Sequence, residues 1–302
     1  MLTNATKKIK SIPSYLYRNY AAPRIYGIRD RRILLKNLEL KNKYTGQRCF
    51  IIGAGPSIAD TDLSKLNKEC TFVVNEFEKN KQYGTLKPKF HVIVESNYFT
   101  EGRPEYWRER FKEKDRNIPV ETTMIINLKA IPFINKHGLF KKHNIYYVGT
   151  QGIFSKNLPF NIKLDKYVPN PKNSVLMCLI AAAWMGFEEI YLLGCEHSFL
   201  AQPTGQNQSL GFSHGYSEEN SKLSETKTED LPKYITAKEM NLDYEANIAH
   251  VLQLFRSYRL FYAKVLKVNP NFKILNATPN SFLDIFPVVN FADIKLHENT
   301  RT

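Results

Sequence analysis

The chain has 302 residues, of which 43% are hydrophobic and 13% aromatic, and this composition excludes a disordered, fibrous or low-complexity protein. Its net charge of +14 predicts attraction to phosphate, nucleic acid or an anionic membrane surface. Most of the charge lies in residues 1–48, which contain 12 lysines and arginines and two acidic residues. We therefore expect a basic amphipathic N-terminal extension over residues 1–46, with short helices, and a catalytic domain over residues 47–302.

The cysteines and the hydropathy of the chain indicate a compartment. Cys49, Cys70, Cys178 and Cys195 stand in apolar contexts without metal-binding or redox spacing, which favours a reduced cytoplasmic environment. No run approaches the roughly 18 apolar residues that a membrane-spanning helix needs. Membrane contact is therefore expected to be peripheral.

The order of predicted elements is typical of an α/β protein. Short β-branched and aromatic runs predict buried parallel strands, and two longer apolar segments predict helices. In chain order these are strands at 48–52, 71–75, 90–94, 124–126 and 145–148, a helix at 174–186, a strand at 189–194, a helix at 243–268 and a strand at 272–276. The polar segment at about 201–242 reads as a lid or as a solvated loop. We expect a Rossmann-like parallel sheet flanked by helices, with this insertion and the helical extension.

A glycine-rich turn, Gly53-Ala54-Gly55-Pro56-Ser57, follows the first strand. Such a turn lets backbone N–H groups approach an anion at the start of a helix, so it is a candidate phosphate site. It lacks the third glycine of the dinucleotide fingerprint and the lysine of a P-loop, which disfavours nicotinamide cofactors and Walker-type ATP binding. A tight turn without a ligand is the alternative.

Asp60-Thr61-Asp62 has the D-x-D spacing with which some transferases hold a divalent cation. Because Leu63-Ser64-Lys65-Leu66 follows directly, we favour an N-cap role for the aspartate over a metal site. No other cluster has convincing metal-ligand spacing, and no metal is expected.

Polar residues follow several predicted strands. Asn75, Asn97 and Asn173 end strands or open a helix, and Glu196 and His197 follow the strand that stops at Gly194. Parallel sheets bind ligands at the carboxyl ends of their strands, and an amide can both donate to and accept from a nucleobase, ribose or carboxylate. Each asparagine alone is a common turn residue, so the prediction rests on their joint placement.

Two of the seven histidines are candidates for a general base, which needs a pKa near the working pH. His197 follows a buried strand beside Glu196, and His214 lies in an aromatic island of the polar segment together with Tyr216. The other five are expected to be structural or solvated: His91, His137, His143, His250 and His297. The sequence leaves open which of His197 and His214 is the base.

The motifs resemble, in order, those of the bacterial sialyltransferases of glycosyltransferase family 42 and the related domain of motility-associated flagellin glycosylation factors. The residues that carry the resemblance are Gly53–Ile58 with Asp62–Ser64, Val74–Phe77, Asn173–Cys178, Gly186–Gly194 and Thr278–Ser281. The resemblance spans about residues 47–286.

The resemblance implies a metal-independent, inverting transferase with a GT-A-like sialyltransferase fold and a CMP-activated nonulosonic acid as donor. It assigns the donor nucleotide and phosphate to the turn, with Pro56 and Ser57, and to Asn75, Asn97, Asn173, Ser174 and Gly194. Catalytic roles would fall to His214 or His197 with Glu196, and Tyr216 or Tyr234 would support the departing phosphate. No cofactor beyond the CMP-sugar substrate is implied.

The chain departs from that family after the strand at 189–194. Glu196 keeps an acidic residue, but His197-Ser198 replace the family's aromatic stretch. The donor could therefore be another CMP-sugar, such as a pseudaminic, legionaminic or Kdo-type acid.

The expected partners follow from this interpretation and from the charge. A glycan or lipid-linked acceptor at the bacterial inner membrane, reached from the cytoplasm, fits a basic and aromatic segment at residues 1–48 that lies on the membrane. No zinc finger, RNA-binding signature or helix-turn-helix spacing supports a specific nucleic-acid partner. A homo-oligomer is compatible with the sequence.

Three other functions remain open at the level of sequence. An ATP- and magnesium-dependent pyrophosphokinase on the same scaffold would use Asp60 and Asp62, and chelator would abolish its activity. A non-enzymatic nucleotide- or glycan-binding accessory protein would keep its function when His197 and His214 are substituted. A nucleic-acid binder would show salt-dependent affinity residing in residues 1–48.

Overall fold

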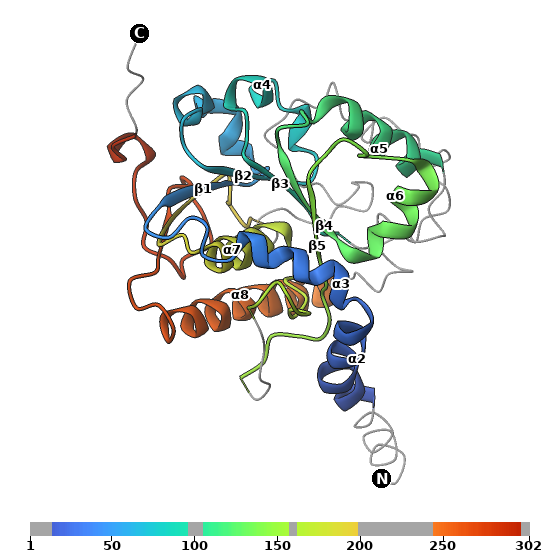
Figure 1. The fold of residues 1–302 in the computed structure, drawn as a ribbon. Coiled ribbons are helices and arrows are strands. Elements are labelled where there is room, and N and C mark those ends of the chain that lie inside the picture. The colour runs from blue at the N-terminus through green and yellow to red at the C-terminus, as the bar shows by residue number, and fades with distance from the viewer. Residues whose placement is uncertain (1–13, 96–104, 157–161, 199–243, 297–302) are drawn as a thin grey trace.

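The structure, a computed structural model, describes residues 14–95, 105–156, 162–198 and 244–296. In these residues the chain forms one seven-stranded parallel sheet with the order β5-β4-β3-β2-β1-β6-β7 (Figure 1). The strands are β1 Arg48–Ile52, β2 Thr71–Val74, β3 Phe90–Ile93, β4 Thr123–Asn127, β5 Ile145–Val148, β6 Glu189–Leu193 and β7 Lys273–Asn276. The predicted Rossmann-like α/β fold is confirmed, and every predicted strand is present.

Helices cover both faces of the sheet. The described helices are α2 Ala22–Arg29, α3 Arg31–Leu34, α4 Tyr83–Leu86, α5 Glu105–Asn117, α6 Ile131–His137, α7 Ser174–Met185 and α8 Tyr244–Leu266. α7 and α8 lie on one face, and α4, α5 and α6 lie on the other (Figure 1). Each face has its own apolar cluster, because successive strand residues point to opposite sides.

The strand order places a topological switch point between β1 and β6. From β1 the chain adds strands outward to β5, and α7 then leads it back to β6 on the other side of β1. Connections leaving neighbouring strands in opposite directions open a crevice at their carboxyl ends, where ligands of such sheets bind. A ligand site is therefore expected in the segments that follow β1 and β6.

α7 is the buried helix that the sequence predicts at residues 174–186. Asn173 caps it, since its Oδ1 accepts from the N–H of Leu176 at 2.8 Å. The helix ends at Gly186, whose φ of 86° is left-handed and favours glycine. Eleven of its 12 residues are buried, which explains why its sequence is apolar on all sides.

The described part of the N-terminal segment is largely helical between residues 14 and 40, as expected, but it joins the core before residue 46. Asn37 is fully buried, and its Nδ2 donates to the carbonyls of Tyr147 at 2.9 Å and Leu164 at 2.7 Å. Trp184 of α7 donates its indole N–H to the Asn37 carbonyl at 2.8 Å. The expected boundary at 46 therefore does not mark where packing begins, because this segment covers the edge of β5.

The region after the glycine turn differs from the expected α-helix. It forms two short 3₁₀ segments, Pro56–Asp60 and Leu63–Leu66. Asp62 caps the second, accepting from the N–H of Ser64 at 3.1 Å and from its hydroxyl at 2.6 Å. The N-cap prediction for this residue is confirmed. None of the described helices has the length and apolar character needed to cross a membrane.

Candidate functional site

The glycine turn packs against the chain that leaves β6. Alternate amides of the turn donate across the switch point: Gly53 to the Leu193 carbonyl at 2.7 Å, Gly55 to the Gly194 carbonyl at 2.9 Å, and Ser57 to Glu196 Oε1 at 2.7 Å. The sequence assigned the amides of this turn to a phosphate. In the structure these three amides donate to the chain that leaves β6 instead. The only anionic group among their acceptors is the Glu196 carboxylate, which accepts from the Ser57 N–H.

Close packing explains why two positions of the turn are glycine. A Cβ on Gly53 would collide with the Gly194 carbonyl oxygen, and a Cβ on Gly55 would overlap Glu196 Oε2. Gly194, with a φ of 61°, has no room for a side chain against Ile58. The glycines thus bring the two chain segments into direct contact, a role that the sequence could not separate from anion binding.

Two polar atoms are left without a partner at this contact. Glu196 is 8% exposed, and its Oε2 is buried with no hydrogen bond, as is Ser57 Oγ. Buried polar groups in folded proteins are almost always hydrogen-bonded, and a missing partner costs about 1–3 kcal/mol. One acceptor and one hydroxyl at this contact therefore lack a partner among the described residues.

Asn75 lies beside this contact, directly after β2. Its φ of 54° is left-handed, a conformation that asparagine tolerates better than most residues. The backbone carbonyl accepts from Lys114 Nζ at 2.9 Å and bonds His91 Nε2 at 2.8 Å, while Oδ1 accepts from Ser174 Oγ at 2.7 Å. The structure thus brings together Asn75 and Ser174, as the sequence predicts, and holds them at the start of α7.

His197 belongs to a buried chain of hydrogen bonds. Its Nδ1 is 3.0 Å from the Cys195 carbonyl, so this nitrogen carries the proton, and Nε2 is 3.0 Å from the Tyr258 hydroxyl. Asn173 Nδ2 donates to the same hydroxyl at 2.9 Å and lies 3.3 Å from Nε2. The chain of bonds therefore ties the end of β6 to the cap of α7.

These contacts engage both ring nitrogens of His197. It is 8% exposed, and burial lowers its pKa to about 4 despite the bond to the Cys195 carbonyl. A neutral imidazole with both nitrogens engaged has no free lone pair for an acceptor hydroxyl. His91, expected to be structural, is fully buried with a pKa lowered to about 3, again chiefly by burial.

The lowered pKa of His197 predicts a pH dependence of stability. The unfolded chain binds a proton below about pH 6.5, whereas folded His197 stays neutral down to about pH 4, so the free energy of unfolding falls as pH falls through this window. We expect His197→Asn, which suits the left-handed φ of 54°, to reduce the slope by up to about 1.4 kcal/mol per pH unit. Urea unfolding at several pH values measures both slopes, and identical slopes would contradict the assignment.

A buried ionic cluster contacts Asn75 through Lys114, which donates to the Asn75 carbonyl. Lys114 of α5 is 1% exposed, and its Nζ lies 2.6 Å from Glu78 Oε1. Glu76 pairs with Arg110 at 3.3 Å and with Lys79 at 3.4 Å. Burial raises the pKa of Glu76, but the charges of Lys114, Arg110 and Lys79 outweigh it and lower the pKa overall.

The sequence missed Lys114 and Tyr258 as parts of this site. Lys114 lies in a highly charged helix, where nothing separates it from solvated lysines. Tyr258 could have been found more easily, since it lies on the apolar stripe of α8 with Leu254 and Phe261. A hydroxyl on such a stripe needs a buried partner, and His197 or Asn173 could have been sought on that ground.

Several predicted site residues lie outside the described residues. These are Asn97, His214, Tyr216 and Tyr234, with the whole lid segment at about 201–242. Pro56 is exposed at the outer side of the turn. Among the described residues, no group of three or more histidines, cysteines, aspartates or glutamates is arranged to hold a metal ion.

No protein-family model matches the chain, and no curated protein does. A solved structure that is similar to it is the MAf glycosyltransferase from Magnetospirillum magneticum AMB-1, with 13% sequence identity and a TM-score of 0.47. The similarity covers 89% of this chain and 39% of that protein, so the chain spans well under half of its length. At this level of similarity, substrate and reaction must be inferred from the residues of the site.

Proposed function

We propose that the protein is a metal-independent glycosyltransferase that takes a nonulosonic-acid-type sugar from a CMP-activated donor, with inversion. The observation that carries the proposal is the pair of unpartnered buried atoms, Ser57 Oγ and Glu196 Oε2, at the switch point of a parallel sheet. A nucleotide supplies what they lack, since its hydroxyl and amino groups donate and its oxygens accept.

The described residues suggest where the nucleoside and the phosphate of the donor would bind. Glu196 Oε2 would accept from a ribose hydroxyl or the cytosine amino group, and Ser57 Oγ would donate to a neighbouring oxygen. The phosphate would lie at the start of α7, where the helix dipole favours an anion and Ser174 and the Asn75 amide supply polar groups. Neither placement needs the amides of the glycine turn.

The base that activates the acceptor hydroxyl is assigned in this proposal to His214, with Tyr216 near the departing phosphate. His197 would instead position Asn173 through Tyr258. The acceptor would be a glycan or lipid-linked glycan at the bacterial inner membrane, approached by the basic N-terminal segment. In support, Ile25 and Ile28 of α2 are 51% and 77% exposed among the arginines of that segment.

A nucleotide panel in a thermal-shift experiment tests the proposal. A ligand that binds only the folded state at about 100 times its Kd adds about 2.7 kcal/mol of stability, which is several degrees in Tm. We expect CMP or CDP to raise the Tm without magnesium, and UDP, GDP and NAD to have little effect. A shift produced by ATP with magnesium alone, or no shift with any nucleotide, would overturn the proposal.

Ser57→Ala separates a ligand contact from a structural one. Because Ser57 Oγ has no partner among the described residues, its removal should leave the free energy of unfolding unchanged or slightly higher. The same substitution should weaken CMP binding about tenfold, as expected for one lost hydrogen bond. Ser64→Ala, on the adjacent 3₁₀ segment, is the matched control and should leave CMP affinity unchanged. Equal CMP affinity in wild type and Ser57→Ala would remove Ser57 from the donor site.

A further inference from the structure

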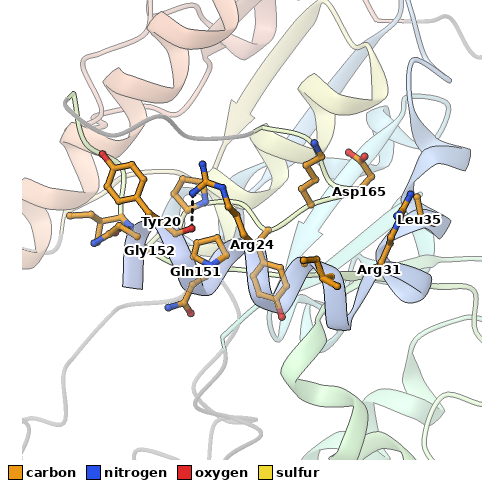
Figure 2. Close-up of a pocket in the computed structure, with 15 residues that line it drawn as sticks. Tyr20, Arg24, Arg31, Leu35, Gln151, Gly152 and Asp165 are labelled. Atoms are coloured by element: carbon orange, nitrogen blue, oxygen red, sulfur yellow. Dashed lines mark hydrogen bonds between the residues drawn. The ribbon is translucent and has the colours of Figure 1, made fainter. Parts of the chain in front are cut away.

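A pocket lies away from the switch point, between the N-terminal helices and the chain that leaves β5. It encloses about 750 Å³, within the range of pockets that hold small molecules. One wall is a single helical face with members at three- and four-residue spacing: Tyr20, Pro23, Arg24, Gly27, Ile28, Arg31 and Leu35. The other wall comes from residues 151–153 and 165–167 and from Pro169, and Figure 2 shows the two walls with Arg24, Arg31 and Asp165.

The charges of this pocket select an anion. Arg24, Arg31 and Lys166 line it, against one carboxylate, Asp165. Arg24 is partly used, since it donates to the Tyr20 carbonyl at 2.8 Å. Within the described residues, Arg31 and Lys166 form no ion pair. A phosphate suits such a set, because guanidinium groups bind phosphate oxygens with two parallel hydrogen bonds.

The carboxylate adds a second requirement on the ligand. Asp165 Oδ1 is buried and has no hydrogen-bond partner in the described structure. A ligand that satisfies it must carry a hydroxyl or amino donor close to its phosphate. A choline head group offers no such donor, whereas a phosphodiester of a polyol carries hydroxyls that can donate to the carboxylate.

The surroundings of the pocket point to a ligand with an acyl portion. Ile28 lines the pocket and is 77% exposed, and Ile25, Leu16 and Tyr17 on the same segment are each about half exposed. Apolar side chains beside unpaired cations are the pattern of a surface that lies on a membrane. We propose that this pocket binds the polyol phosphate head group of an anionic phospholipid, of which phosphatidylglycerol is the simplest example. The inference rests on the membrane contact of the proposed function and locates its binding site.

Gly27 provides a direct test because it leaves the centre of the helical wall open. A Cβ on Gly27 meets no atom within 4 Å, so larger side chains fit without distorting α2. We expect Gly27→Phe to fill the pocket and to reduce binding of the full chain to vesicles of phosphatidylcholine and phosphatidylglycerol at least tenfold, in a co-sedimentation assay. Gly27→Ala, the matched control, should bind as the wild type does. If charge alone attracted the protein to the vesicles, Gly27→Phe would bind as well as the wild type or better, since it keeps every charge and adds apolar surface.

Adjacent arginines supply a second variant pair. Arg31 lines the pocket and Arg32 does not, although the two have equal charge. We expect Arg31→Ala to lose about tenfold or more in binding, through a lost charge-assisted hydrogen bond, and Arg32→Ala to lose about fivefold or less. Equal losses for the two arginines, or equal binding to vesicles in which a fatty acid supplies the same negative charge, would overturn the proposal.

Two further arms distinguish the source of the ligand. Soluble glycerol 3-phosphate that raises the Tm of the wild type but not of Gly27→Phe, without vesicle binding, would assign the pocket to a free metabolite and overturn the lipid. Displacement of the vesicles by an RNA oligonucleotide, with the same sensitivity to Gly27→Phe, would overturn it in favour of nucleic acid. None of these readouts depends on CMP binding or transfer, so the lipid site and the proposed transferase activity can fail separately.

Discussion

Gly53→Ala is expected to lower the free energy of unfolding by about 3 kcal/mol or more. The added Cβ would meet the Gly194 carbonyl oxygen and approach its carbon at 3.0 Å and Cys195 Sγ at 3.1 Å. Two of these atoms are backbone at the end of β6, and they cannot turn away as a side chain does. Relief therefore requires that the carboxyl ends of β1 and β6 move apart, which also breaks the 2.7 Å bond from Gly53 N–H to the Leu193 carbonyl. Urea denaturation measures the change.

Gly84→Ala is the matched control for this substitution. Gly84 lies in α4, and a Cβ there meets no atom within 4 Å. We expect unchanged stability or a gain of up to about 1 kcal/mol, from the better helix propensity of alanine. If Gly53→Ala were as mild as Gly84→Ala, the close contact between β1 and β6 would be wrong.

Gly55 should behave differently from Gly53, although both belong to the same turn. Its added Cβ would overlap the Glu196 carboxylate, a side-chain end that can rotate, and would approach the Gly194 carbonyl oxygen at 2.7 Å. The expected loss of stability is smaller, but the Ser57 N–H bond and the position of Glu196 Oε2 are lost together. Substitution of Gly53 therefore tests the contribution of the switch point to stability, and substitution of Gly55 tests the position of Glu196 in the candidate site.

Much of the fold could be predicted because burial leaves a strong trace in the sequence. Every strand is a short apolar run, and α7 is apolar on all sides since it lies in the core. α5 and α6 could not be found in the same way. The residues of α5 are mostly charged, and Pro132 in the first turn of α6 reads equally well as a loop. The turn after β1 was misjudged for a local reason, since Pro56 and the Asp62 cap favour two short 3₁₀ segments over one helix.

The candidate site was predicted where its residues follow strands and was missed where they reach it from helices. Asn75 and Ser174 meet, and Glu196 lies at the same edge of the sheet, because the carboxyl ends of parallel strands share one edge. The bonds that decide their roles depend on packing instead. The Glu196 carboxylate within the glycine turn and the Tyr258 hydroxyl on His197 require distances that spacing along the chain does not encode. For that reason the sequence left His197 and His214 undecided, whereas the structure shows both ring nitrogens of His197 in hydrogen bonds.

Lys114→Met is the second substitution with a large expected effect, a loss of about 3–5 kcal/mol in the free energy of unfolding. Lys114 and Glu78 are both almost fully buried, at 1% and 2% side-chain exposure, and lie 2.6 Å apart. Without the ammonium group, the buried Glu78 carboxylate would lose its 2.6 Å ion pair. The Asn75 carbonyl would also lose its 2.9 Å bond from Lys114 Nζ.

Lys112→Met on the same helix is the control. Lys112 pairs with Glu109 at 3.0 Å, but both side chains are about half exposed, and solvent-exposed pairs contribute about 0–1 kcal/mol. A double variant, Lys114→Met with Glu78→Gln, should recover part of the loss, because the remaining amide is neutral. The double-mutant cycle from urea unfolding gives the coupling energy. Equal losses in Lys114→Met and Lys112→Met, or no recovery in the double variant, would show that the buried Lys114–Glu78 pair does not make the expected contribution to stability.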